Sequence, residues 1–128
     1  MNITEDCMRT VTHSSLTLTN GKTLVAPYGI LIDENSNVFY VSDWVQHIVA
    51  KFSVGSTLGK IVAGSLINNA IYNSLGIIAK MRFDLFGQIY LMDSDNNRVV
   101  QLLNENGDLR TIAGKLVILV YECSIYKC

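Results

Sequence analysis

Residues 90–102 read YLMDSDNNRVVQL, and residues 40–52 read YVSDWVQHIVAKF. A shift of 50 residues superimposes the two stretches without a gap, so that the opening tyrosines coincide and Asp43 meets Asp93. Self-similarity at a period of 20–50 residues is the signature of supersecondary units stacked on one another. The chain is therefore predicted to contain two copies of one structural unit.

Each copy predicts four short strands, because Val, Ile, Tyr and Phe dominate runs that Gly, Asn, Asp and Ser separate. The expected strands are 28–33, 38–42, 47–52 and 60–63 in the first copy, and 77–83, 88–92, 98–103 and 109–113 in the second. Asn106-Gly107 favours a hairpin turn, because both residues tolerate positive φ. Upstream of residue 40 the copies slip by one residue, which makes Phe39 an extra residue and predicts a β-bulge there.

Four antiparallel strands at this period are typical of β-propeller blades. The predicted fold is all-β, with two four-stranded antiparallel blades that form an open arc of a propeller. The expected division is an N-terminal segment that supplies a strand to a preceding blade (1–26), a first repeat (27–64), a loop with the second repeat (65–114) and an apolar tail that begins a third blade or is a foreign end (115–128).

Two blades on their own leave two sheet faces uncovered, and apolar surface left in water costs about 25 cal/mol per Å². The chain is therefore expected to be a fragment of a longer propeller, or to associate with itself and close a ring.

The residues at the predicted strand ends and turns of both copies form a set of motifs. They are Pro27-Tyr28-Gly29-Ile30, Asp33, Asp43-Trp44, Gln46-His47-Ile48-Val49 and Val62-Ala63-Gly64 in the first copy, and Asp84, Gly87-Gln88-Ile89-Tyr90, Asp93-Ser94, Asn96-Asn97-Arg98-Val99-Val100 and Ile112-Ala113-Gly114 in the second. This set resembles the NHL repeat, the blade of NHL β-propellers. Ser36 stands where the family has Gly, and Ile48 stands where it has Arg.

The resemblance implies a non-enzymatic scaffold that binds a protein partner. Three alternatives stay open: the substrate-recruiting part of a protein of the ubiquitin-ligase type, an RNA-binding propeller fragment, and the remnant of a propeller lyase or hydrolase. No RING-like cysteine cluster is present, so ligase chemistry is not expected in this chain.

The DSDNN patch at residues 93–97 has the start of a calcium-binding loop. Such a loop needs Gly at its sixth position and Glu at its twelfth, where this chain has Arg98 and Asn104. We therefore predict no metal site, and a turn instead. Asp43 and Asp93 are expected to cap their turns, because Asx side chains bond backbone N–H groups two residues on. Arg98 is expected to reach such a carboxylate or to cross to a neighbouring blade.

Loops at one mouth of a propeller form a composite surface, and binding residues concentrate on loops. The candidate binding residues on the two turns are Trp44, Gln46, His47, Asp95, Asn96 and Asn97. For Trp44 we favour packing against the adjacent blade, because Trp is usually largely buried. The alternative is an exposed anchor for a protein partner.

Composition and charge bear on the class of chain and on RNA binding. Of the 128 residues, 49% are apolar and 16% charged, which is typical of a globular chain, and a net charge of −1 with scattered Lys and Arg disfavours RNA. The odd set Cys7, Cys123 and Cys128 suits unpaired thiols in a reducing compartment.

No signal peptide and no apolar span of about 20 residues is visible, so we expect no membrane insertion and a cytoplasmic location. Two histidines and no nucleophile or phosphate-loop motif predict no catalytic residues and no cofactor.

Overall fold

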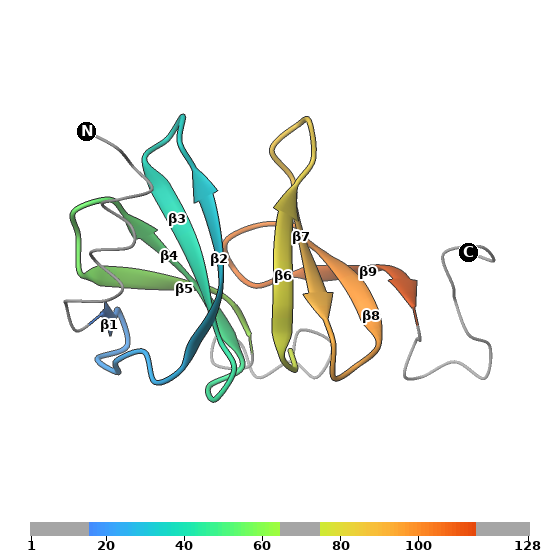
Figure 1. Cartoon of the computed structure of the whole chain (residues 1–128), viewed down its shortest axis with the longest axis horizontal. Coiled ribbons are helices and arrows are strands. Elements are labelled where there is room, and N and C mark those ends of the chain that lie inside the picture. The colour runs from blue at the N-terminus through green and yellow to red at the C-terminus, as the bar shows by residue number, and fades with distance from the viewer. Residues whose placement is uncertain (1–15, 65–74, 115–128) are drawn as a thin grey trace.

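The computed structural model describes residues 16–64 and 75–114, which form two open β-sheets and no helix (Figure 1). The first sheet contains β1 (Thr17–Leu18), β2 (Pro27–Asp33), β3 (Val38–Asp43), β4 (Ile48–Ser53) and β5 (Leu58–Gly64). The second contains β6 (Ile78–Phe83), β7 (Ile89–Asp93), β8 (Arg98–Leu102) and β9 (Leu109–Gly114). Their orders are β1-β5-β4-β3-β2 and β6-β7-β8-β9. The prediction of an all-β fold with two four-stranded antiparallel blades in an open arc is confirmed.

Several sequence-based predictions lie outside the described residues. They concern the loop at 65–74, the apolar tail at 115–128 and the three cysteines. Within the described ranges, no helix has the length and apolar character to cross a membrane.

The N-terminal strand β1 extends the first blade. It runs parallel to β5, with Thr17 opposite Leu58 and Leu18 opposite Gly59. This placement differs from the expected strand of a preceding blade. The physical reason is burial: Leu16 and Leu18 are 5% and 1% exposed and cover the outer apolar face of the first sheet.

The two blades repeat each other down to their irregularities. In both, the register shifts between the third and fourth strands, at Val49/Ala50 and at Val99/Val100. The bulge predicted at Phe39 is wrong, because Phe39 pairs with Ile32 and Phe52 in an unbroken ladder. The extra residue of the first copy lies instead in the turn between β2 and β3.

This turn also corrects the alignment of the two copies. The residue with positive φ is Asn37 in the first blade (φ 55°) and Gly87 in the second (φ 80°). Asn tolerates the left-handed region better than other non-Gly residues. Asn37 is therefore the counterpart of Gly87, and Ser36 is not.

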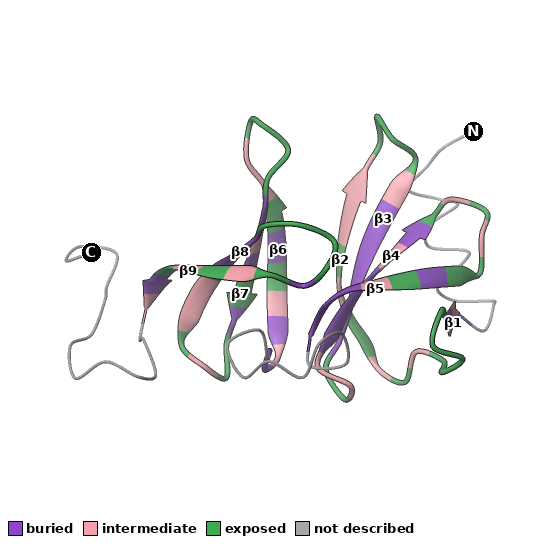
Figure 2. Ribbon diagram, turned by 180° about the vertical axis from the view of Figure 1, so that it is seen from behind, coloured by how far each residue is buried: buried purple, intermediate pink, exposed green. Residues whose placement is uncertain are grey.

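The core is divided into two clusters. One fills the space between the sheets, with Tyr40 and Val49 from the first blade and Ile78, Leu91 and Val100 from the second. The other lies on the outer face of the first sheet, where the rings of Phe39 and Phe52 stack at 5.4 Å. Buried residues consequently run along β3, which has apolar neighbours on both faces (Figure 2).

A close contact between β2 and β6 joins the blades. The Ser42 hydroxyl accepts a hydrogen bond from Gly29 N–H (2.8 Å) and donates one to the Ile78 carbonyl (3.0 Å). A Cβ on Gly29 would lie 2.9 Å from Ser42 Oγ and 3.4 Å from the Ile78 carbonyl. This joint therefore depends on a glycine and a small hydroxyl side chain.

The second blade does not repeat this joint on its outward face. There the places of Gly29 and Ser42 are taken by Lys80 and Met92, which pair across the strands and are exposed. A blade docked in the same way would meet a long cationic side chain where the first joint has no side chain at all.

We expect Gly64→Ala to destabilise the protein far more than Gly55→Ala. Both glycines have positive φ, but a Cβ on Gly64 would lie 2.4 Å from the His47 carbonyl, and a Cβ on Gly55 would meet nothing within 4 Å. The strained backbone costs about 1–2 kcal/mol in either variant, and the clash brings the loss for Gly64→Ala to about 3 kcal/mol or more. Urea unfolding of both variants measures the difference, and equal losses would contradict the close approach.

Candidate functional site

The first blade is closed at one end by a carboxylate without access to water. Asp43 ends β3 and is 1% exposed. Its Oδ2 accepts hydrogen bonds from Val25 N–H (2.7 Å), Ala26 N–H (3.3 Å) and Gln46 Nε2 (2.9 Å). Its Oδ1 accepts from Val45 N–H (3.0 Å) and Gln46 N–H (3.1 Å). One side chain thus fixes both the turn after β3 and the segment before β2.

These hydrogen bonds decide the charge state of Asp43. Burial raises the pKa of a carboxyl, because it penalises the charged form. In Asp43 the hydrogen bonds from Val25, Gln46 and Ala26 outweigh burial and hold the pKa below its ordinary value. The carboxylate is therefore ionised at neutral pH and keeps all five acceptor contacts.

Asp93 holds the same place in the second blade with different partners. It is fully buried, and its Oδ1 accepts from Gly76 N–H (3.1 Å). Its Oδ2 accepts from Asn96 Nδ2 (2.9 Å) and from Arg98 Nε (3.0 Å), the latter within a salt bridge. Arg98 thus contacts the carboxylate of its own hairpin. The side chain of Asp93 therefore points into the protein.

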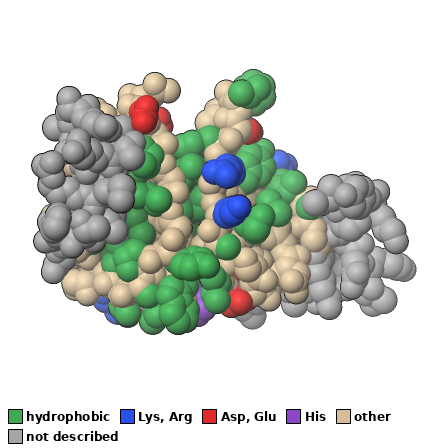
Figure 3. All heavy atoms as spheres, viewed as in Figure 1, with side chains coloured by type: hydrophobic (Ala, Val, Ile, Leu, Met, Phe, Trp, Pro, Cys, Tyr) green, Lys and Arg blue, Asp and Glu red, His purple; other side chains and the backbone are tan. Residues whose placement is uncertain are grey.

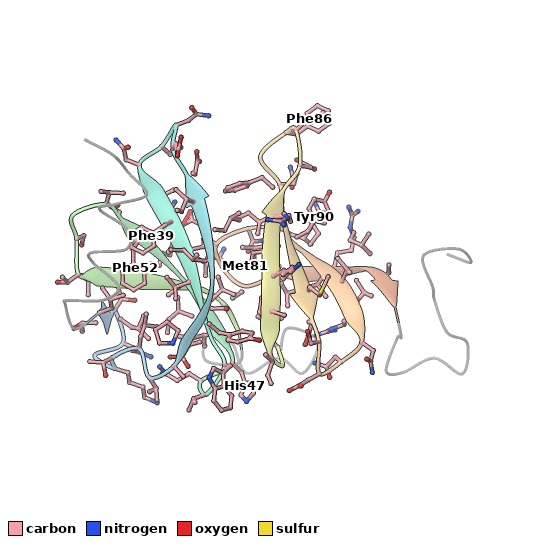
Figure 4. All side chains as sticks on the ribbon, in the orientation of Figure 1. Phe39, His47, Phe52, Met81, Phe86 and Tyr90 are labelled. Carbon is pink, nitrogen blue, oxygen red and sulfur yellow. The ribbon has the colours of Figure 1, made fainter. Side chains whose placement is uncertain are left out.

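His47 connects the two turns. Its Nδ1 lies 3.2 Å from the carbonyl of Gly76, whose N–H is bound by Asp93. A Cβ on Gly76 would lie 2.5 Å from Asp95 Cβ, so that only a glycine fits between His47 and the second turn. Figure 4 places His47 at the lower end of the first blade, facing the second.

The structure separates the predicted binding residues into two groups. Gln46 and Asn96 donate to the buried carboxylates of their own turns, and His47 contacts Gly76. Asp95 and Asn97 are exposed, and Asn97 takes positive φ (50°) as His47 does (57°).

Trp44 is the correction among these residues. We expected it to pack against the adjacent blade, but it is 46% exposed. Its turn is already fixed from inside by Asp43 and Gln46, and the two residues between them, Trp44 and Val45, are exposed.

Trp44 belongs to a group of exposed apolar residues, here called the turn-end patch: Val25, Tyr28, Trp44 and Val45, between 45% and 63% exposed. The Asp43 carboxylate binds the N–H groups of Val25 and Val45, and Trp44 N–H donates to the Ala26 carbonyl (3.2 Å). Figure 3 shows apolar side chains gathered at this end, beside the histidine. Sequence reasoning missed Val25 and Tyr28, because they read as parts of strands rather than as surface.

Among residues 16–64 and 75–114, no three His, Cys, Asp or Glu side chains converge as metal ligands would. A shallow hollow of about 170 Å³ opens near the opposite end, lined by Tyr40, Gly87, Gln88, Ile89, Leu102, Leu103, Asn104 and Glu105. Burial, followed by the charges of Glu105 and Asp33, raises the pKa of the Tyr40 hydroxyl there. Tyr40 is consequently a neutral phenol at physiological pH.

In comparisons with known proteins, no protein-family model and no curated protein matches the chain.

We expect Asp43→Asn to destabilise the protein at neutral pH but much less in acid. An Asn amide would present N–H donors to other N–H donors, which costs about 1–3 kcal/mol for buried groups left unpaired. Because the folded-state pKa of Asp43 is lowered, its stabilisation is fully present above the ordinary Asp pKa of about 3.9 and is lost as pH falls through the folded-state value.

Urea unfolding of wild type and Asp43→Asn at pH 7, 4 and 2.5 checks this expectation. The other carboxyl groups are the same in both proteins and cancel in the comparison. A gap that stays constant over this pH range would show that the Asp43 charge does not contribute to stability.

Proposed function

We propose that the chain is a non-enzymatic protein-interaction scaffold made of β-propeller blades of the NHL type, and that the turn-end patch binds a protein partner. The observation that carries this proposal is a half-exposed tryptophan on a turn held by a buried carboxylate. The repeat motifs and the two-blade architecture support the same class of protein.

The turn-end patch has the chemistry of a binding hot spot. Trp and Tyr dominate the energy of protein interfaces when they enter desolvated pockets. Burying a fully exposed large apolar side chain contributes about 1.5–3 kcal/mol. The four patch residues are about half exposed, so each contributes about half of that, and together they offset part of the entropy lost on association. The fixed turn lowers that entropy further, because little conformational freedom remains to be lost on binding.

The surroundings of the patch suit a protein partner. Gln46, His47, Asp95 and Asn97 are polar residues on the two turns at this end, and they provide a hydrogen-bonding rim around an apolar centre. Interfaces typically combine an apolar centre with a polar rim.

We expect Trp44→Ser to weaken partner capture strongly without affecting folding. Affinity capture from cells that express the protein, quantified by mass spectrometry, compares wild type, Trp44→Ser and the control Leu58→Ser. Leu58 is 55% exposed on β5 and lies outside the patch. A protein bound through the patch, once purified, should bind Trp44→Ser about 30-fold more weakly, the loss typical of a hot-spot residue. Proteins captured equally by all three variants would contradict the proposal.

RNA binding is a second candidate, supported by the outward face of the second blade. Arg82, Tyr90, Gln101 and Arg110 pair in a row across this sheet, beside Lys80 and Met92. If this face binds single-stranded RNA through three cations, the plot of log affinity against log salt concentration should have a slope of about −2. The double variant Lys80→Ser/Arg82→Ser should flatten the slope. A slope near zero would argue against RNA binding.

A further inference from the structure

The hairpin between β6 and β7 carries two bulky apolar residues almost entirely in water. Leu85 is 99% exposed and Phe86 is 87% exposed. Figure 4 shows Phe86 at the tip of this hairpin, at the opposite end of the blades from His47. The turn-end patch and the hairpin tip are therefore separate surfaces.

The hairpin is held by the side chain of Asp84. Its Oδ1 accepts from Phe86 N–H (2.8 Å) and Gln88 N–H (2.9 Å), and its Oδ2 accepts from the Tyr90 hydroxyl (3.0 Å). Gly87 supplies positive φ, and its N–H donates to the Asp84 carbonyl (3.2 Å). None of these interactions uses the side chains of Leu85 or Phe86.

The equivalent hairpin of the first blade shows what the turn requires. Between β2 and β3, Asp33 Oδ1 accepts from Asn35 N–H (3.1 Å) and Ser36 N–H (3.4 Å), and Asn37 has positive φ. The residues at its tip are all polar and exposed: Glu34, Asn35 and Ser36. The equivalent turn, one residue longer, thus forms with the same aspartate capping and without an apolar residue, so the turn itself does not account for Leu85 and Phe86.

We propose that Leu85 and Phe86 form an anchor that inserts into an apolar pocket of a partner protein, and that the rim of this pocket is basic. Preorganisation supports insertion, because the hydrogen bonds of Asp84 fix the tip before binding. Charge complementarity supports the basic rim: the turns at 33–37 and 84–88 contain Asp33, Glu34 and Asp84 but no Lys or Arg. The cations nearest to the second turn in the sequence, Lys80 and Arg82, lie on the outward face of the sheet rather than in the turn. Acidic side chains lie beside both hairpin tips in Figure 3.

The same charges disfavour the other occupants of an apolar anchor. An anionic membrane would repel the carboxylates at both tips. In a symmetric dimer formed tip to tip, these carboxylates would approach their own copies, and like charges oppose such contacts. A protein pocket with Lys or Arg at its rim would bury the apolar side chains at the tip and pair with the carboxylates beside them.

With both ends engaged, the chain connects two proteins. The anchor does not depend on the turn-end patch, because the two surfaces share no residue and lie at opposite ends of the blades. The failure of either proposal would therefore leave the other standing.

The test places a photo-crosslinking residue at the tip. Phe86→p-benzoyl-Phe keeps an aromatic ring at the anchor, and Ser36→p-benzoyl-Phe puts the same group at the tip of the equivalent hairpin. Both full-length variants are irradiated in cells that express the protein, and the adducts are identified. We expect an adduct with a particular protein from position 86 that is missing from position 36.

The captured protein is then purified and its affinity measured. Phe86→Ser should weaken binding about 30-fold, and Ser36→Ala should leave it unchanged. Binding should weaken with added salt, since the rim charges are screened. Unfolding midpoints should match that of the wild type, because neither tip side chain contributes to the hairpin.

Four results would overturn the proposal. They are the same adducts from both positions, crosslinks to lipid, crosslinks to a second copy of the chain, and the lack of any protein adduct from position 86. An adduct whose purified protein binds Phe86→Ser as well as wild type would also overturn it.

Discussion

A buried carboxylate at the same end of each blade is the constraint from which most of the structure follows. An ionised side chain without water is tolerated only when donors surround it. Asp43 draws its donors from the segment before β2 and from the turn after β3, so satisfying the charge ties these stretches together. Asp93 does the same with Gly76 and Arg98, and Gly76 in turn contacts His47. The two carboxylates therefore fix both turns and the contact between them.

The local part of this architecture was predictable from the sequence, and the non-local part was not. Strand positions followed from apolar runs between turn residues, and the period of 50 residues predicted two blades. A one-residue slip, in contrast, looks the same whether the extra residue lies in a strand or in a turn. Only the backbone φ angles identified Asn37 as the residue of the first blade that is equivalent to Gly87 in the second. The parallel pairing of β1 with β5 has no local signature, and the exposure of Trp44 depends on the inward space being taken by Asp43 and Gln46.

The two blades have the same strand order but different side chains on one pair of equivalent sheet faces. The face of the first blade that contacts the second has Gly29 and Leu31 on β2. The equivalent face of the second blade has Lys80 and Arg82 on β6. Both strands shift register at the equivalent point, between Pro27 and Ile30 in β2 and between Ile78 and Lys80 in β6. The difference therefore lies in the side chains: Lys80 and Arg82 are exposed, while Ile78 and Met81 stay in the core. In β6 the charged side chains of Lys80 and Arg82 are thus separated from the apolar side chains of Ile78 and Met81. A third blade on this face would need a contact unlike the one between β2 and β6.

Because the chain contains two copies of one unit, a comparison of equivalent positions shows which residues the fold requires and which it does not. Each turn requires an aspartate that accepts backbone N–H groups and a residue that tolerates positive φ, and both blades supply them. The remaining turn positions are free, and water favours polar residues there, as Glu34, Asn35 and Ser36 illustrate. Trp44, Leu85 and Phe86 occupy free positions with large apolar side chains. Exposed apolar surface of this kind gains nothing within the described part of the fold, and this is the reason for proposing that these side chains contact a partner.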